Sequence, residues 1–348
     1  MFLHAISTAN PPRSFSQREC LELALASPLM EGALDRRSRL MLSTILRGDS
    51  GIDSRQFAAR DLGKLFSLDA DGLNEEFRQT APALAAAALA PALEQASLRP
   101  EDLDALVVCT CTGYLCPGLS SYISELLGLR SDAWLQDLVG LGCGAAIPAL
   151  RATAGILAGN PSANVACVAV EVCSAAFYLD NDPGVIVSAC LFGDGAAATI
   201  WKGRPGGLDL RAHSFDTHHD PDARDRIRFE QRNGKLRNLL HPSVPDLAAG
   251  AVKRLHERAD AVGGNPISRI LCHSGGRDVL AALQGAFPDH DFAVPREILR
   301  RHGNMSSPSV LFALAEALRE DRPAASGDWW LTAFGAGFSA HSCRISAA

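Results

Sequence analysis

Residues 139–150 read Val-Gly-Leu-Gly-Cys-Gly-Ala-Ala-Ile-Pro-Ala-Leu, and this glycine-rich turn into an apolar run decides the fold. It predicts a helix that opens at Cys143 and runs to about Ala158, where Gly159-Asn160-Pro161 ends it. The first turn of a helix presents unpaired N–H groups and partial positive charge, which lower the pKa of a thiol. The pattern therefore predicts a nucleophilic cysteine. The alternative is a buried cysteine that packs as a small apolar side chain.

Strands and helices alternate on both sides of this helix. In the first half the pattern predicts helices over 80–97 and 120–129, strands over 106–110 and 165–172, and an apolar link over 135–141. In the second half it predicts helices over 244–262, 278–287 and about 306–318, a strand over 267–272, and a hairpin of 329–334 with 339–345. Alternating units of this kind predict an α/β fold with two similar parallel or mixed sheets covered by helices.

The composition is that of an ordinary globular protein. The 348 residues are 47% hydrophobic and 21% charged, with a net charge of −6. A chain of this length predicts two domains or two fused halves. No dense basic stripe points to a nucleic acid, and no apolar run is long enough to span a membrane. The ten cysteines lie mostly in apolar runs and no secretion signal opens the chain, so we expect reduced thiols in the cytoplasm.

Two further polar residues follow predicted elements in the second half. His273 comes directly after the strand 267–272, and Asn304 stands at the start of the last helix. Reactive residues in α/β folds gather in the loops beyond the carboxyl ends of strands. Asn304 alone could be a helix cap and His273 a loop histidine. Together with Cys143, they predict a catalytic set. Cys109, Cys111 and Cys116 lack a second ligand pair at zinc spacing, and we expect no metal there.

Motifs along nearly the whole chain resemble one family, the type III polyketide synthases of the chalcone synthase type. They are Ile6-Ser-Thr-Ala-Asn-Pro-Pro12, Ser50-Gly-Ile-Asp-Ser-Arg55, Gly142-Cys143-Gly144, Leu191-Phe-Gly-Asp-Gly-Ala-Ala-Ala198, His273-Ser-Gly-Gly276, Gly303-Asn-Met-Ser-Ser307 and Phe334-Gly-Ala-Gly-Phe338. The resemblance implies a thiolase-like fold, with two pseudo-equivalent halves of mixed sheet in an αβαβα layering. It places Cys143 in the half 1–205, and the catalytic histidine and asparagine in the half 206–348.

The resemblance also implies an activity, that of an acyltransferase. Cys143 would take an acyl starter from an acyl-CoA, and His273 would pair with its thiolate. His273 and Asn304 would bind the thioester carbonyl of malonyl-CoA as it loses carbon dioxide, and the enolate would attack the acyl-cysteine. Repeated rounds and cyclisation would give a pyrone, a resorcinol or a related aromatic product. The resemblance implies a homodimer as well, with coenzyme A thioesters as substrates and with no metal or prosthetic cofactor.

The resemblance further implies which residues meet the substrate. Phe192 would be a gate between the coenzyme A tunnel and the cavity, and Cys116 would reach across the dimer toward the neighbouring subunit's cavity. The remaining substrate-binding positions are Cys111, Cys173, Ala176, Ser306 and Gly275. Plant members commonly carry hydroxylated residues where this chain has Cys111, Cys173 and Ala176. The smaller or more apolar lining predicts a starter that is not a plant-type phenylpropanoid, because pocket volume selects the acyl group.

Three questions stay open at this level. Arg36, Arg37, Arg39 and Arg47 could bind the coenzyme A phosphates or form a solvated helix face, since Asp49 stands where plant enzymes usually have a lysine. The charged segment 216–229 is predicted to be a surface loop, with His218 and His219 not a metal site. The alternatives to the main function are a single-condensation enzyme of the ketoacyl-acyl-carrier-protein synthase III type and a non-catalytic scaffold.

Overall fold

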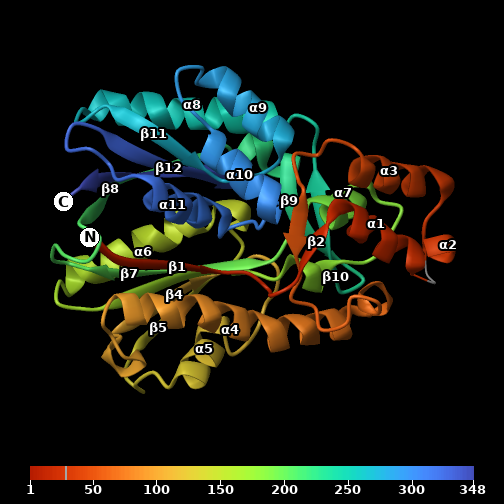
Figure 1. Ribbon diagram of the computed structural model, residues 1–348, viewed down its shortest axis with the longest axis horizontal. Helices are drawn as coiled ribbons and strands as arrows, with labels where there is room; N and C mark the ends of the chain where they lie inside the picture. The colour runs from red at the N-terminus through yellow and green to blue at the C-terminus, as the bar shows by residue number, and fades with distance from the viewer. Residues whose placement is uncertain (28–29) are drawn as a thin grey trace.

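The computed structural model describes residues 1–27 and 30–348 (Figure 1). Its main feature is a nine-stranded sheet in the order β11-β12-β13-β8-β1-β7-β6-β4-β5. These strands are β1 (Phe2–Ala9), β4 (Ala105–Cys109), β5 (Trp134–Leu138), β6 (Val165–Glu171), β7 (Gly195–Lys202), β8 (Leu210–His219), β11 (Ile267–Cys272), β12 (Asp328–Gly335) and β13 (Ser339–Ala347). Two short antiparallel pairs lie apart from it: β2 (Ser14–Ser16) with β3 (Ser54–Gln56), and β9 (Ile227–Arg232) with β10 (Lys235–Leu240).

The sheet consists of two halves with the same strand pattern. In one half β7 is antiparallel to β6, which is parallel to β4. In the other half β13 is antiparallel to β12, which is parallel to β11. Strand β1 joins the halves, because it pairs with β7 from Phe2 to Ala9 and with β8 at Phe2 and Leu3. This repeat confirms the two pseudo-equivalent halves, whereas the division of the chain at residue 205 stays a prediction.

Helices form three layers with the two halves of the sheet between them (Figure 1). Helices α4 (Ala70–Gln95) and α5 (Leu119–Leu127) cover the outer face of β4, β6 and β7. Helices α6 (Ala146–Gly159) and α11 (Ser309–Glu320) fill the space between the halves. Helices α8 (Val244–Val262) and α9 (Arg277–Ala286) cover the outer face of β11 and β12. The layering is therefore αβαβα, as predicted.

The remaining helices gather with the two short strand pairs beyond one end of the sheet, at the right of Figure 1. They are α1 (Gln17–Ala26), α2 (Met30–Ala33), α3 (Arg36–Arg47) and α7 (Pro183–Leu191), with α10 (Ala293–His302) beside them. Buried apolar residues join α1, α3 and α7, among them Leu21, Leu42 and Ile186. This lobe closes the end of the sheet near which the predicted catalytic residues lie.

Most predicted elements match the structure, and their bounds differ where tertiary contacts decide. Helix α8 and strand β11 have the predicted limits. The helix predicted from residue 80 begins at Ala70, because the Asp69 side chain accepts a hydrogen bond from Gly72 N at 2.8 Å and caps it. The apolar link predicted over 135–141 is instead the edge strand β5, which pairs with β4 in parallel.

The prediction of a surface loop over 216–229 is wrong. The segment forms the end of β8, a 3-10 turn over Pro221–Arg226 and the start of β9. Ala223 and Ile227 are buried, and β9 pairs with β10 in antiparallel register. The density of charge hid the alternation of apolar and polar positions that is typical of a half-buried strand.

Candidate active site

Cys143 lies in a 3-10 turn, Gly142–Gly144, that precedes α6. The predicted position in the first turn of the α-helix is therefore wrong by a few residues, since α6 begins at Ala146. The turn packs against the end of β12. Gly142 has φ +60°, and a Cβ there would lie 2.9 Å from Ala336 N. Only glycine fits this left-handed position against the opposing backbone, so the flanking glycines place the thiol at the junction of the two halves.

Burial dominates the chemistry of the Cys143 thiol. The residue is 5% exposed, and burial raises its pKa to about 12. Ser306 Oγ, at 3.3 Å from Sγ, lowers the pKa in part. The prediction that a helix start lowers this pKa is wrong for the resting protein, because removing a thiolate from water costs more than the nearby N–H groups return. At neutral pH the thiol is protonated.

His273 follows β11 directly and is also buried. It is 1% exposed, and its ring meets the Phe334 ring edge to face, with centroids 5.4 Å apart. Burial lowers the pKa of His273 to about 4, so the imidazole is neutral. Within the described residues its Nδ1 atom is buried without a hydrogen-bond partner. A neutral, incompletely paired imidazole can accept a proton from a substrate or from the thiol.

Asn304 is held by its backbone and its side chain. Its N–H donates to Leu191 O at 2.9 Å, and its Nδ2 donates to Gly275 O at 3.0 Å. Its Oδ1 accepts a hydrogen bond from Ser306 N at 2.8 Å, and Ser306 adopts a left-handed φ of +58°. These contacts fix the amide, whose second Nδ2–H has no partner among the described residues.

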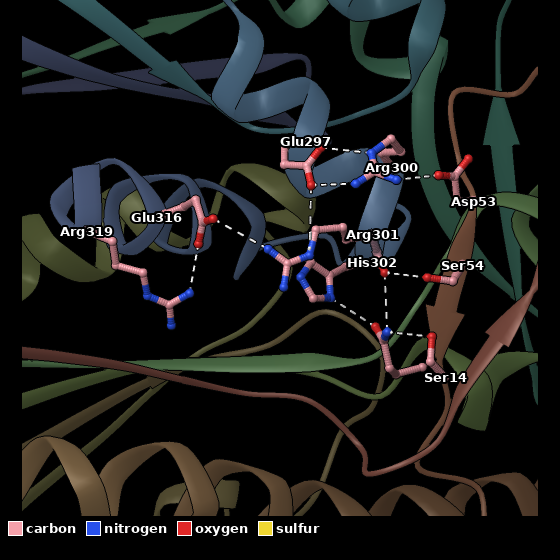
Figure 2. Close-up of polar contacts among 10 residues, drawn as sticks. Ser14, Asp53, Ser54, Glu297, Arg300, Arg301, His302, Glu316 and Arg319 are labelled. Atoms are coloured by element: carbon pink, nitrogen blue, oxygen red, sulfur yellow. Dashed lines mark hydrogen bonds and ion pairs between the residues drawn. The ribbon is translucent and has the colours of Figure 1, made fainter. Parts of the chain in front are cut away.

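Polar contacts hold the end of α10, two residues before Asn304 (Figure 2). Arg301 O accepts hydrogen bonds from Ser54 Oγ at 3.0 Å and Gln56 Nε2 at 3.2 Å, and His302 Nδ1 lies 3.0 Å from Gln56 Oε1. Arg300 forms an ion pair with Asp53. Strand β3 and the residue before it thereby fix the last turn of α10, from which the chain turns through Gly303 to Asn304.

The predicted residues line two adjoining cavities. Cys143, His273, Asn304, Phe192 and Gly275 line one, whose free volume is about 50 Å³. Cys111, Cys173, Ala176, Ser306 and again Phe192 line the other, whose free volume is about 30 Å³. Each has room for only a few water molecules. Cys116 is exposed and lines neither of these cavities. The site residues predicted from the sequence therefore lie close together in the structure, with the exception of Cys116.

Comparison with known proteins identifies the family. Residues 30–206, about half of the chain, match the model of the FAE1/type III polyketide synthase-like proteins. A 1,3,6,8-tetrahydroxynaphthalene synthase of Streptomyces peucetius subsp. caesius is 30% identical over 347 residues, covering 97% of this chain and 90% of the relative. The chain belongs to the type III polyketide synthase family. Residues 259–346 also match the C-terminal model of 3-oxoacyl-[acyl-carrier-protein] synthase III.

Other relatives agree with this assignment. A 3,5-dihydroxyphenylacetyl-CoA synthase of Streptomyces toyocaensis is 29% identical, covering 90% of this chain and 82% of the relative. The fold is that of PKS-I from the brown alga Ectocarpus siliculosus, with a TM-score of 0.89, 22% identity and coverage of 100% and 98%. The synthase is thus an acyltransferase, and the relatives do not support the single-condensation alternative or a non-catalytic scaffold.

Sequence reasoning missed one group in the site of this synthase, the Glu171 carboxylate. It is fully buried at the end of β6, and burial raises its pKa. It accepts hydrogen bonds from Ser307 Oγ at 2.6 Å, Thr112 Oγ1 at 2.9 Å and Cys111 N at 3.0 Å, and lies 3.4 Å from Ser306 Oγ. The signal was available, since Glu171 is the one charged residue in the apolar stretch 165–172.

Two buried ionic residues from the quoted motifs also support the cavity walls. Arg55 Nη1 donates to Ala189 O and Phe192 O, each at 2.8 Å, and so fixes the backbone of the predicted gate. Asp194 accepts hydrogen bonds from Ala58 N at 2.6 Å and Ser174 N at 2.9 Å, and burial raises its pKa to about 6. Both act on position and not on the reacting atoms.

The four arginines considered for the coenzyme A phosphates lie on α3. Arg36, Arg37 and Arg47 are exposed and Arg39 is half-buried, and none lines the two cavities. Asp49 lies 3.8 Å from Arg277 Nη1 in an ion pair. Which residues hold the phosphates stays a prediction. Across the described ranges, no group of three His, Cys, Asp or Glu could hold a metal, and no helix is both long and apolar enough to cross a membrane.

Proposed function

We propose that this synthase loads an acyl starter from coenzyme A onto Cys143, extends it by decarboxylative condensation with malonyl-CoA, and releases a cyclised aromatic product. The observation that carries the proposal is the convergence of Cys143, His273 and Asn304 on one buried cavity. The three come from three separate elements, and each contributes a different chemical ability: a nucleophile, a base and a non-titrating donor.

Loading begins from a neutral pair. Because the pKa of the thiol is about 12 and that of His273 about 4, the resting site holds a thiol and a neutral imidazole. The thiol gives its proton to His273 as Sγ attacks the thioester carbonyl. The coenzyme A thiolate then leaves and takes that proton from the imidazolium. His273 therefore acts as a general base and then as a general acid.

Extension needs donors to a developing oxyanion. As malonyl-CoA loses carbon dioxide, negative charge moves onto its thioester oxygen. The second Nδ2–H of Asn304 and a ring N–H of His273 stabilise that charge in a site that excludes water, each by about 3 kcal/mol. The enolate carbon attacks the acyl carbonyl on Cys143, the carbon–sulfur bond breaks, and the thiolate that leaves takes up one proton from solvent to restore the resting thiol.

The narrow lining supports a starter that is not a plant-type phenylpropanoid. Cys111, Cys173 and Ala176 surround a free volume of about 30 Å³ beside Ser306. A phenylpropanoid ring does not fit in this pocket, because ligand pockets for molecules of that size are several hundred Å³. We therefore propose that this pocket does not bind a phenylpropanoid ring. The relatives are named for aromatic products, 1,3,6,8-tetrahydroxynaphthalene and 3,5-dihydroxyphenylacetyl-CoA, and we propose an aromatic product here as well.

The experiment is a panel of acyl-CoAs incubated with malonyl-CoA, with products read by mass spectrometry. We expect extended, cyclised products with malonyl-CoA as the only extender and without a carrier protein. The same panel after dialysis against a chelator should give the same rates, since we propose that no metal or prosthetic cofactor takes part. A synthase that extends only malonyl groups carried by an acyl carrier protein, and only once, would refute the proposal.

We also propose a homodimer through the edge strand β5. Strand β5 ends the sheet, so one row of its backbone N–H and C=O groups is unpaired within the sheet. Trp134 is 63% exposed, Leu135 37% and Val139 48%, and Tyr114 nearby is 70% exposed. An apolar edge of this kind supports pairing with a second copy, which would bring Cys116 toward the partner's cavity.

The dimer is tested by light scattering during gel filtration. We expect twice the monomer mass for the wild type and the monomer mass for Trp134→Lys. Val262→Lys is the matched control, because Val262 is 82% exposed on α8, far from β5. A wild-type monomer would refute the proposed dimer. All ten cysteines are free thiols, which supports the further proposal of a reducing, cytoplasmic location.

A further inference from the structure

A third cavity opens beside the reactive cysteine, on the side of the 3-10 turn over Pro221–Arg226 and β9. Its free volume is about 460 Å³, far larger than that of the two cavities above. Arg224, Asp225 and Arg228 line it together with Cys111, Gly142 and Phe229. The charged segment that the sequence predicted to be a surface loop is therefore a cavity wall.

The third cavity lies next to Cys143 through two independent contacts. Gly142, which precedes the cysteine, lines it. Cys111 also lines it, and Cys111 Sγ lies 3.1 Å from Ser306 Oγ, which in turn lies 3.3 Å from Cys143 Sγ. The cavities around Cys143 and Cys173 are narrow, so the third cavity, past Cys111, offers the larger adjoining space for an acyl chain bound to Cys143. Its far end would then lie among the arginines.

The two arginines have unused hydrogen-bond donors. Arg228 Nε lies 3.2 Å from Asp225 Oδ1 but is not directed at it, and is buried without a hydrogen-bond partner. Arg228 Nη1 is 3.2 Å from Glu230, and Arg224 Nε is 3.7 Å from Asp225. Within the described ranges, neither guanidinium donates a hydrogen bond, although both have counter-ions nearby. Asp225 is shared by Arg224 and Arg228, and Glu230 is shared by Arg228 and Arg237, so neither carboxylate serves Arg228 alone.

The lining changes character along the cavity. Phe229 and Leu236 provide an apolar wall that this cavity shares with the cavity of Cys111 and Cys173. Arg224, 72% exposed, and Arg228, 41% exposed, lie toward solvent. Such a lining suits a chain that is apolar near the thioester and carries an anion at its other end. The planar guanidinium matches a carboxylate with two parallel hydrogen bonds.

We propose that Arg224 and Arg228 bind the terminal carboxylate of the acyl chain carried by Cys143, so that the preferred starter is a coenzyme A monothioester of a dicarboxylic acid. The proposal rests on the function proposed above and names its substrate class. The anion could instead be a coenzyme A phosphate. The two sources are separable, because every acyl-CoA carries the phosphates but only a dicarboxylic thioester carries the distal carboxylate.

The test compares matched pairs of starters that differ only in the distal carboxylate. The pairs are succinyl-CoA with butyryl-CoA, glutaryl-CoA with pentanoyl-CoA, and adipyl-CoA with hexanoyl-CoA. Acylation of Cys143 is followed by intact-protein mass spectrometry without malonyl-CoA, so that loading alone is measured. We expect the wild type to load at least one dicarboxylic thioester about ten to a hundred times more efficiently than its partner, as a charge-assisted hydrogen bond predicts.

The variants are Arg228→Gln and the double variant Arg224→Gln, Arg228→Gln. Both should lose the carboxylate preference and leave loading of the monocarboxylic partner unchanged. Arg226→Gln is the matched control, because Arg226 lies in the same segment but is hydrogen-bonded to His241 Nε2 at 2.9 Å. It should keep the preference. Both substituted arginines are partly exposed, and thermal unfolding checks that the variants stay folded.

Three outcomes would overturn the proposal. The first is a wild type that shows no preference for the carboxylate at any chain length. The second is a preference that survives in the double variant. The third is a double variant that loads both members of each pair equally more slowly, which would assign the arginines to the coenzyme A phosphates. A protein that forms no acyl-Cys143 with any coenzyme A thioester would instead refute the proposed function. Failure of the inference is thus distinguishable from failure of the function.

Discussion

Alkylation of Cys143 by iodoacetamide should accelerate about tenfold for each pH unit between pH 7 and pH 10. Burial raises the pKa of this thiol from 9.0 to about 12, and only the thiolate reacts. At pH 7 the thiolate fraction is then about 10⁻⁵, against about 10⁻² for a thiol at the ordinary value. Cys143 should therefore react roughly a thousandfold more slowly than an unperturbed thiol, which is about 4 kcal/mol of desolvation.

The assay is peptide mapping of the alkylated protein across this pH range, in a Cys116→Ser background that removes the exposed thiol. His273→Gln should leave the alkylation rate within about threefold, because the thiol is neutral with either residue. The same variant should slow acyl loading by about a hundredfold or more, since the proton acceptor is lost. An alkylation rate that is independent of pH between 6 and 8, and that collapses in His273→Gln, would refute this reasoning and indicate a preformed ion pair.

Three further outcomes follow from the same site. Cys143→Ala should abolish chain extension but keep malonyl-CoA decarboxylation, because His273 and Asn304 remain, and loss of both activities in a folded variant would contradict the assigned roles. Acid should destabilise the fold, because burial lowers the pKa of His273 from 6.5 in the unfolded chain to about 4 in the folded one. The stability that the neutral imidazole contributes is present above pH 6.5, and about 3 kcal/mol of unfolding free energy is lost by pH 4. Urea unfolding of His273→Gln should therefore have a shallower pH dependence. Gly142→Ala should lower the unfolding free energy by more than about 1 kcal/mol, because of φ +60° and the contact with Ala336 N, and an unchanged melting temperature would contradict this.

The grouping of Cys143, His273 and Asn304 around one cavity could be predicted from sequence because each member has a local signature. His273 follows a strand whose limits the sequence predicted correctly, and Asn304 and Cys143 each lie at a turn before a helix. The family motifs then place these turns in one fold. Cys116 differs, since the role implied for it depends on a second subunit, and its exposure in one subunit does not test that role.

The protonation states and the third cavity could not be predicted because they depend on tertiary burial. The backbone N–H at Cys143 does lower the pKa of the thiol, as the position before a helix predicts. Burial raises the pKa by more. Segment 216–229 has a surface composition, and Arg228 lines a cavity because β9 pairs with β10, which places Leu236 in the same cavity wall. The sequence shows Glu171 as a charged residue in an apolar strand. Its hydrogen-bond partners could not be predicted, because residues such as Ser307 lie far from it along the chain.

Burial explains why a site with an unreactive resting thiol suits decarboxylative condensation. The desolvation that raises the pKa of Cys143 also strengthens the hydrogen bonds that Asn304 and His273 make to an enolate oxygen, because the same charge–dipole interaction is larger where water is excluded. Cys143 carries the acyl group as a neutral thioester during this step, so its sulfur adds no charge beside the developing enolate. The thiolate forms only during acyl transfer. The slow reaction of the resting thiol with alkylating reagents is therefore a consequence of the same burial that promotes the carbon–carbon bond-forming step.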